Sequence, residues 1–68
     1  MLFGTVKWFN AEKGYGFIVP ETADKDVFFH VTQLEKIGMK TVDQGVHIGY
    51  TTYKDRGRTA AGDLKIFA

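Results

Sequence analysis

The sequence predicts a small all-β fold, either a barrel or a sandwich, and three observations support this prediction. The 68-residue chain contains five short runs rich in Val, Ile, Thr, Tyr, Phe and Trp. Turn-forming residues separate these runs, which is the pattern of consecutive strands. One short stretch alone has helical spacing. The length suits one domain, which we expect to span residues 1–68.

The first two predicted strands form a pair joined by a short turn. The first strand covers residues 2–10, LFGTVKWFN, and the turn NAEKG follows at residues 10–14. The second strand covers residues 15–19, and Pro20 closes it because proline cannot donate a hydrogen bond to a neighbouring strand. A hairpin is therefore expected over the first twenty residues.

Three more strands follow a polar loop at residues 21–26. They are expected at residues 27–31, 46–53 and 60–67, with KDRGRT as the turn before the last strand. Between the third and fourth strands, Thr32 and Glu35 fit the capping-box pattern, and Gly38 is a plausible helix stop. This stretch predicts a single turn, of the 3₁₀ type.

Alternation along the second and third strands predicts which side chains face water. Histidine is the poorest core candidate in these strands, so the face that carries His30 is taken as the outer one. Gly14 and Gly16 then lie on the inner face, where a missing side chain permits close packing. The opposite assignment, with the rings in the core and His30 buried, stays open. The predicted outer residues are Tyr15, Phe17, Phe28 and His30, and the inner ones Ile18, Val27 and Phe29.

Exposed rings of this kind suit stacking against nucleobases. Trp8 lies in the neighbouring strand and is the best stacking residue of the chain, while Lys7 and Lys13 flank it. Strict alternation would place Lys7 and Trp8 on opposite faces, so a bulge or an edge position is needed for both to serve one surface. Without either, Lys7 is an ordinary solvated lysine. Basic residues in a later turn could together extend a phosphate track, with Asp55 opposing them: Lys54, Arg56 and Arg58. Either arginine alone is better explained as part of a solubilising loop.

Composition favours stacking over charge as the source of affinity. The net charge is +1, from 9 basic and 8 acidic residues, while aromatic residues make up 15% of the chain. The strongly basic balance common in nucleic-acid binders is missing. We therefore expect binding with a shallow dependence on salt.

Other function classes find little support. The chain has no cysteine, and His30 and His47 lack the spacing of metal ligands. Asp24 and Asp26 are better explained as a solvated turn than as a catalytic pair. No stretch resembles a secretion signal or a membrane span. We expect a cytoplasmic protein that is not an enzyme and needs no metal or cofactor.

The stretches GTVKWFNAEKGYGFI at residues 4–18 and DVFFHV at residues 26–31 resemble the bacterial cold-shock protein family. That family carries two ribonucleoprotein motifs, close to K-G-F-G-F-I and V-F-V-H-F, in this order. The resemblance covers nearly the whole chain, and it is looser after residue 31. It implies a five-stranded antiparallel OB-type β-barrel with a short 3₁₀ turn after the third strand.

The resemblance also implies binding of single-stranded RNA and DNA with low sequence specificity. Family members act as RNA chaperones, and some affect transcription termination or translation. Carried over by position, the implied binding residues are Lys7, Trp8, Phe9, Lys13, Tyr15, Phe17, Phe28 and His30. Either Arg56 or Arg58 matches the basic loop residue of the family.

Several positions depart from the family pattern. Val31 and Met39 stand where many members carry aromatic rings, and Phe3 stands where many carry a polar residue. Each missing stack is expected to weaken binding by about 1–3 kcal/mol. Tyr15 replaces the usual Phe and keeps a ring that can stack.

Two alternatives stay open beside the nucleic-acid reading. An RRM shares a motif similar to KGYGFIV, but it needs two full helices and the opposite motif order. A protein-interaction module would use exposed rings as anchors for a partner, and an exposed Phe3 would support a dimer. A monomer is the default expectation, with a domain-swapped dimer as the alternative.

Overall fold

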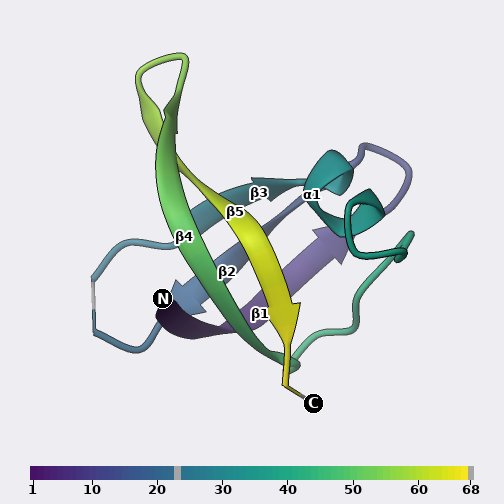
Figure 1. Cartoon of the computed structure of the whole chain (residues 1–68), viewed down its shortest axis with the longest axis horizontal. Helices are drawn as coiled ribbons and strands as arrows, with labels where there is room; N and C mark the ends of the chain where they lie inside the picture. The colour runs from purple at the N-terminus through teal and green to yellow at the C-terminus, as the bar shows by residue number, and fades with distance from the viewer. Residues whose placement is uncertain (23, 68) are drawn as a thin grey trace.

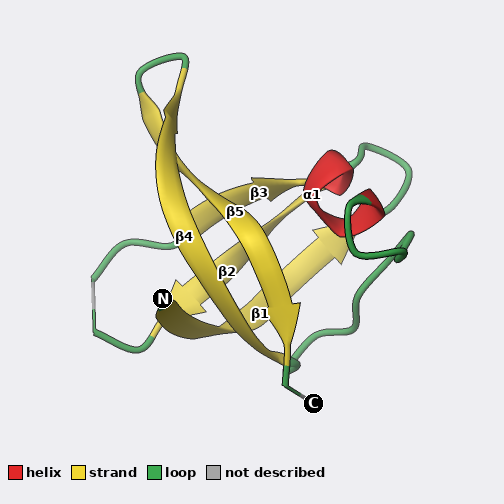
Figure 2. Ribbon diagram, viewed as in Figure 1, coloured by secondary structure: helices red, strands yellow, loops and turns green. Residues whose placement is uncertain are grey.

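The computed structural model describes residues 1–22 and 24–67, which form a closed five-stranded barrel (Figure 1). Figure 2 shows that strands make up most of the molecule and that the helix lies at one end of the barrel. Each predicted strand exists, with ends that differ from the prediction by at most two residues. The strands are β1 (Leu2–Asn10), β2 (Tyr15–Pro20), β3 (Val27–His30), β4 (His47–Asp55) and β5 (Arg58–Ile66).

The barrel closes in the order β1-β2-β3-β5-β4, and one of its pairs is parallel. The pairs β1–β2, β2–β3, β1–β4 and β4–β5 are antiparallel, whereas β3 and β5 run in the same direction, with Phe28 beside Ala60. Strand directions cannot alternate around a closed ring with an odd number of strands. The fully antiparallel arrangement that the sequence predicted is therefore corrected at this one pair.

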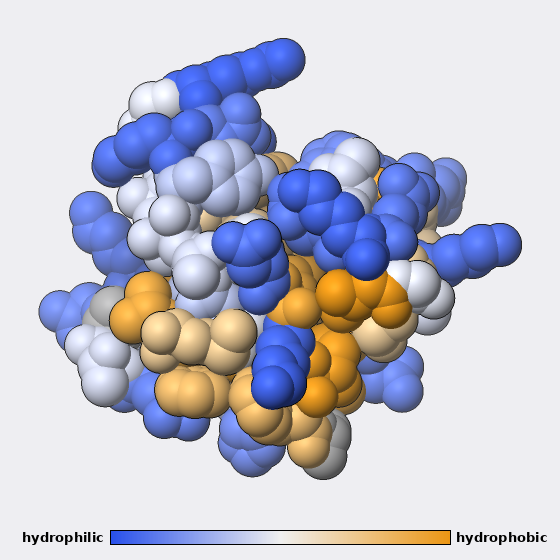
Figure 3. All heavy atoms as spheres, viewed as in Figure 1, coloured by the Kyte–Doolittle hydropathy of each residue, from blue (hydrophilic) through white to orange (hydrophobic). Residues whose placement is uncertain are grey.

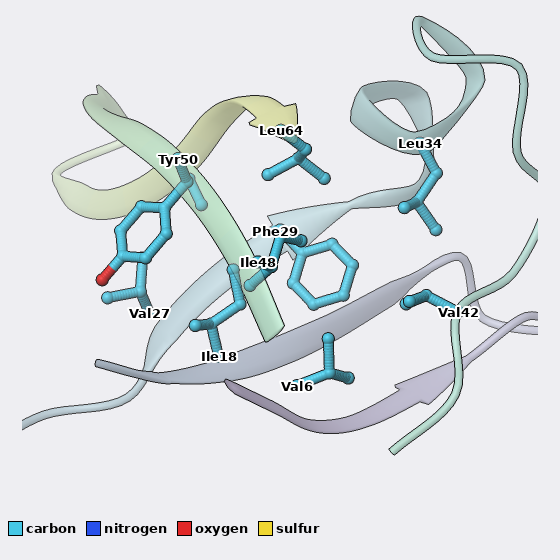
Figure 4. Close-up of a cluster of buried hydrophobic side chains, with 10 residues drawn as sticks. Val6, Ile18, Val27, Phe29, Leu34, Val42, Ile48, Tyr50 and Leu64 are labelled. Carbon is cyan, nitrogen blue, oxygen red and sulfur yellow. The ribbon is translucent and has the colours of Figure 1, made fainter. Parts of the chain in front are cut away.

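The barrel interior confirms the inward face assignment. Ile18 and Phe29 are fully buried, and Val27 is 8% exposed. Figure 4 shows these side chains converging with those of β1, β4 and β5. The opposite assignment is wrong, because the core cluster contains none of the rings expected outside. The labelled core residues are Val6, Ile18, Val27, Phe29, Leu34, Val42, Ile48, Tyr50 and Leu64.

Two glycines shape the β1–β2 hairpin as the sequence predicted. Gly14 has a φ of +80° and donates its N–H to the Asn10 carbonyl at 2.8 Å, so it ends the turn in a conformation that favours glycine. A Cβ on Gly16 would collide with the Trp8 carbonyl and lie 2.9 Å from the Phe9 Cα. The two strands can approach this closely only because position 16 has no side chain.

The segment after β3 is a short α-helix, α1 (Val31–Glu35), rather than the predicted 3₁₀ turn. His30, not Thr32, is its N-cap, because the His30 Nδ1 accepts the Thr32 backbone N–H at 3.2 Å. Bonds of the 3₁₀ type follow the helix, from Ile37 N–H to the Leu34 carbonyl and from Gly38 N–H to the Glu35 carbonyl, both at 3.0 Å. Gly38 ends the turn with a φ of +76°.

Candidate nucleic-acid interface

Four aromatic side chains form a connected group on the outer surface of β1, β2 and β3. We call this group the ring cluster; it comprises Trp8, Tyr15, Phe17 and Phe28. The Trp8 ring centroid lies 5.6 Å from that of Tyr15 and 5.3 Å from that of Phe17. The Phe28 centroid lies 5.7 Å from that of Tyr15 and 6.0 Å from that of Phe17. Tilted and edge contacts at these distances are favourable for aromatic pairs.

Strand register brings the cluster together. Phe17 lies directly opposite Phe28 in the β2–β3 pair, and Tyr15 lies opposite His30. In the β1–β2 pair, Trp8 lies opposite Phe17, after a shift in register between Val6 and Trp8. This irregularity is a bulge, one of the two arrangements that the sequence analysis allowed, and it places Trp8 beside the rings of β2.

Phe28 lies on the predicted outer face, but its ring is covered. The guanidinium carbon of Arg58 lies 3.8 Å from the centroid of the Phe28 ring, and Phe28 is only 6% exposed. Trp8 is 37% exposed, and Tyr15 and Phe17 are half-buried. The expectation of four bare outer side chains is therefore corrected at Phe28, which is capped by a cation.

His30 combines two roles at the edge of the cluster. Its Nδ1 caps α1, and the same nitrogen lies 3.1 Å from the Thr32 Oγ1. The ring is half-buried and lines a hollow of about 390 Å³, which we call the His30 hollow. Phe28, Tyr53, Arg56 and Arg58 also line this hollow. The cap uses Nδ1, which leaves the Nε2 edge of the ring available for a ligand.

Lys7 and Lys13 are both exposed, but their surroundings differ. The Lys7 Nζ forms an ion pair with the Asp26 Oδ2 at 2.8 Å, which is the one salt bridge within residues 1–22 and 24–67. Lys13 lies in the hairpin turn, where its backbone N–H donates to the Asn10 Oδ1 at 2.9 Å. The acidic partner of Lys7 offsets its charge, so Lys13 is the stronger candidate for a phosphate contact.

The β4–β5 hairpin brings basic residues to the side of the cluster. Arg56 and Gly57 occupy its tip with φ of 54° and 85°, as a two-residue type I′ turn requires. Lys54 donates from its Nζ to the Thr59 Oγ1 at 3.3 Å. Lys54 also lines a second hollow, of about 660 Å³, together with Phe17, Lys25, Phe28 and Arg58. We call this one the Phe17 hollow.

The structure does not bring three of the predicted residues to the ring cluster. Phe9 stacks on the buried Phe29, with centroids 5.5 Å apart and an interplanar angle of 18°. Met39 packs against the core and lines a small hollow with Val42 and Val46. Val31 is half-buried at the start of α1, and its backbone N–H donates to the Gly14 carbonyl at 2.8 Å.

Two residues near the candidate interface were not singled out from the sequence. Tyr53 is 41% exposed and lines the His30 hollow, and Lys25 lines the Phe17 hollow. Tyr53 lies opposite Ala60, which in turn lies opposite Phe28, so the strand order β3-β5-β4 aligns the two aromatic residues. Tyr53 could have been noticed as an aromatic residue in a predicted strand. Its place near the interface depends on its alignment with Phe28, which is distant in the sequence.

Features that would indicate other kinds of site are absent from the described part of the chain. Within residues 1–22 and 24–67, no group of three or more His, Cys, Asp or Glu side chains is arranged to hold a metal ion. No helix in the same ranges is long and apolar enough to cross a membrane.

A small closed barrel that carries adjacent rings beside cations has features found in OB-type barrels that bind nucleic acid. Comparison with known families agrees with this class. Residues 2–66 match the model of the 'cold-shock' DNA-binding domain. The chain therefore belongs to the cold-shock domain family, a nucleic-acid-binding and non-enzymatic family whose barrel is of the OB type.

Individual relatives support the same membership. A probable cold shock protein of Sinorhizobium fredii is 45% identical over 67 residues, covering 96% of this chain and 97% of the relative. The probable cold shock protein A of Mycobacterium tuberculosis is 43% identical over 60 residues, covering 87% and 90%. A cold shock protein of Arthrobacter globiformis is 50% identical over 50 residues, covering 74% and 75%.

Proposed function

We propose that this protein binds single-stranded RNA and DNA with low sequence specificity by stacking bases on the ring cluster. The observation that carries the proposal is the contact of four rings on one outer face, with Trp8 in contact with both Tyr15 and Phe17. A stacked base contributes about 1–3 kcal/mol whatever its identity, because every base has a flat face. The binding residues in this proposal are Trp8, Tyr15, Phe17, Phe28 and His30, with Lys13, Arg56 and Arg58 at the phosphates. Lys7 lies beside them but is paired with Asp26.

The same chemistry supports a role as an RNA chaperone. A protein that holds bases apart from their pairing partners shifts RNA toward unpaired conformations by mass action. Effects on transcription termination or translation would follow from the melting of RNA hairpins. This role is a binding function without an enzymatic step, and it places the protein in the cytoplasm with its RNA. A monomer is sufficient for it, because one chain supplies the whole ring cluster.

Two departures from the family pattern set the expected strength of binding, because Val31 and Met39 stand where many family members carry rings. In addition, the Phe9 ring stacks on Phe29 and not on the ring cluster. We therefore propose that affinity is lower than in a relative with every ring present, by about 1–3 kcal/mol for each missing stack.

The test is a titration of the protein with a short oligothymidine, followed by Trp8 fluorescence. Trp8 is the one tryptophan of the chain, so its signal reports on the ring cluster directly. We expect saturable quenching by the single strand at low and moderate salt, and none by a matched duplex. The absence of quenching by the single strand at high concentration would contradict the proposal and would favour a protein partner.

Two variants make the titration specific to the site. Phe17→Leu removes one ring of the cluster, and we expect it to weaken binding by up to about 1–3 kcal/mol. Phe3→Leu is the matched control, because Phe3 is 47% exposed but contacts Phe67 instead, with centroids 5.6 Å apart. Equal losses in the two variants would show that general apolar contact, rather than the ring cluster, holds the strand.

A further inference from the structure

Arg58 occupies the position on Phe28 that a stacked base would take. Its guanidinium carbon lies 3.8 Å from the ring centroid, which is a van der Waals stacking distance. The cover is nearly complete, since Phe28 is only 6% exposed, although it lies on the outer face of β3 and contacts Tyr15 and Phe17. A base can reach the face of Phe28 only after this side chain moves.

Arg58 also lies between the two hollows beside the ring cluster. Both the Phe17 hollow and the His30 hollow are lined by Phe28 and by Arg58. The first extends toward Lys25 and Lys54, and the second extends toward Tyr53 and Arg56. A strand that passes from one hollow to the other must therefore cross the Arg58–Phe28 contact.

Little besides the ring holds the guanidinium in place. Across residues 1–22 and 24–67, the Arg58 side chain forms no ion pair and no hydrogen bond. The guanidinium instead makes a cation–π contact with the Phe28 ring. An exposed cation–π contact contributes about two- to fivefold to an equilibrium constant. A stacked base contributes about five- to 150-fold, so replacement of the guanidinium by a base is favourable.

We propose that Arg58 is a gate on the binding surface, a proposal that rests on the proposed function. In the free protein the guanidinium covers Phe28. When a single strand binds, a base replaces it on the ring, and the two hollows join into one track. The backbone of Arg58 is fixed at the start of β5, so the displaced side chain swings while its Cα stays, and its charge turns to the neighbouring phosphates. The gate lowers the affinity for every base by the same factor, because each base must first displace the cation.

The first test observes the Arg58–Phe28 contact directly by NMR. In the free protein we expect NOE cross-peaks between the Arg58 Hδ protons and the Phe28 ring protons, with Phe28→Leu confirming their assignment. On saturation with a six-nucleotide oligothymidine, these cross-peaks should disappear while Trp8 fluorescence is quenched. Cross-peaks that persist while Trp8 is quenched would overturn the gate. If Trp8 is not quenched at all, the proposed function itself fails, and the gate fails with it.

The second test measures affinity for the same oligothymidine at two salt concentrations. At high salt, where phosphate contacts are screened, Arg58→Ala should bind as tightly as the unmodified protein or up to about fivefold more tightly, because no cation needs displacing. At low salt the variant should lose a phosphate contact, and its salt slope should become shallower by about 0.7.

Arg56→Gln is the matched control for the second test. It removes a neighbouring charge from the same hairpin without uncovering Phe28, so it should weaken binding at low salt and give no tightening at high salt. A loss of fivefold or more for Arg58→Ala at high salt would overturn the gate. Such a loss would mean that the guanidinium itself holds a base while remaining on Phe28.

Discussion

Asp26 restrains the lysine next to the principal stacking residue. The Lys7 Nζ lies 2.8 Å from the Asp26 Oδ2, with the two side chains 52% and 32% exposed. An exposed pair of this kind contributes only about 0–1 kcal/mol to stability. Its larger effect is expected on binding, since a phosphate must compete with Asp26 for the same ammonium group.

Asp26→Asn should therefore tighten oligothymidine binding several-fold at low salt and leave stability nearly unchanged. Its salt slope should steepen by about 0.7, which corresponds to one additional phosphate contact. Affinity at two salt concentrations measures both effects. Asp24→Asn is the control, because it removes the same charge from the same loop without freeing Lys7. Identical gains from the two variants would mean that overall charge, rather than the release of Lys7, is responsible.

At the scale of elements, the β4–β5 hairpin positions Arg58 over Phe28. Its two-residue turn places Arg56 and Gly57 at positive φ, and nothing lies within 4 Å of a Cβ built on Gly57. The cost of a side chain at position 57 is thus backbone strain alone, without a steric clash.

Gly57→Ala should lower the free energy of unfolding by about 1–2 kcal/mol, because alanine is strained at this φ. Gly57→Asn should cost less, since asparagine tolerates the left-handed conformation and is favoured in type I′ turns. Urea unfolding of the two variants measures the difference. An alanine variant as stable as the asparagine variant would show that the turn changes type.

The strands were largely predictable from the sequence, whereas two features of their assembly were not. Hydrophobic alternation and the position of His30 identified the inner face of β2 and β3 correctly. The parallel β3–β5 pair follows from closure of the ring, and no local pattern carries that information. The cap of α1 was placed at Thr32 because the capping box is a hydroxyl pattern, while the residue that accepts the N–H is the imidazole of His30.

At the scale of the molecule, two groups of apolar side chains within residues 1–22 and 24–67 reach the surface. The first is the ring cluster. The second lies near the chain ends, where the exposed Phe3 and Phe67 contact each other, and Figure 3 shows apolar atoms over this part of the face. Hydrophilic atoms cover the β4–β5 hairpin in the same view.

The ring cluster was predictable because alternation and one bulge determine it. Its cover was not predictable, because Arg58 is thirty positions from Phe28 along the chain and meets it only through the β3–β5 pair. The positions of Phe9 and Met39 were not predictable for the same reason. Their residue types match stacking or packing equally well, and only the closed barrel shows that both pack against the core.

The buried Tyr50 makes the stability of the folded protein depend on pH in the alkaline range. Tyr50 is 1% exposed, and burial, followed by the charge of Glu21, raises the pKa of its phenol above the usual 10.0. The folded protein therefore keeps the proton that the unfolded chain releases near pH 10. This contribution to stability is fully present below that pH and is lost as pH rises through the folded pKa.

Between pH 8 and about pH 11, the free energy of unfolding should thus fall more steeply for the unmodified protein than for Tyr50→Phe. Urea unfolding at several pH values measures both slopes, and the difference between them isolates the contribution of the Tyr50 phenol. Parallel curves would show that Tyr50 ionises equally well in the folded and unfolded states.

The nearly neutral charge of the protein predicts a shallow dependence of binding on salt. With a net charge of +1, the protein lacks a basic field that would draw in nucleic acid, and Asp26 already pairs with Lys7. About three cations remain for phosphates: Lys13, Arg56 and the displaced Arg58. At about 0.7 per contact on a single strand, the slope of log affinity against log salt should be about −2. Trp8 quenching at a series of salt concentrations measures it. A slope steeper than about −4 would mean that phosphate contacts, rather than stacking on the ring cluster, supply most of the affinity.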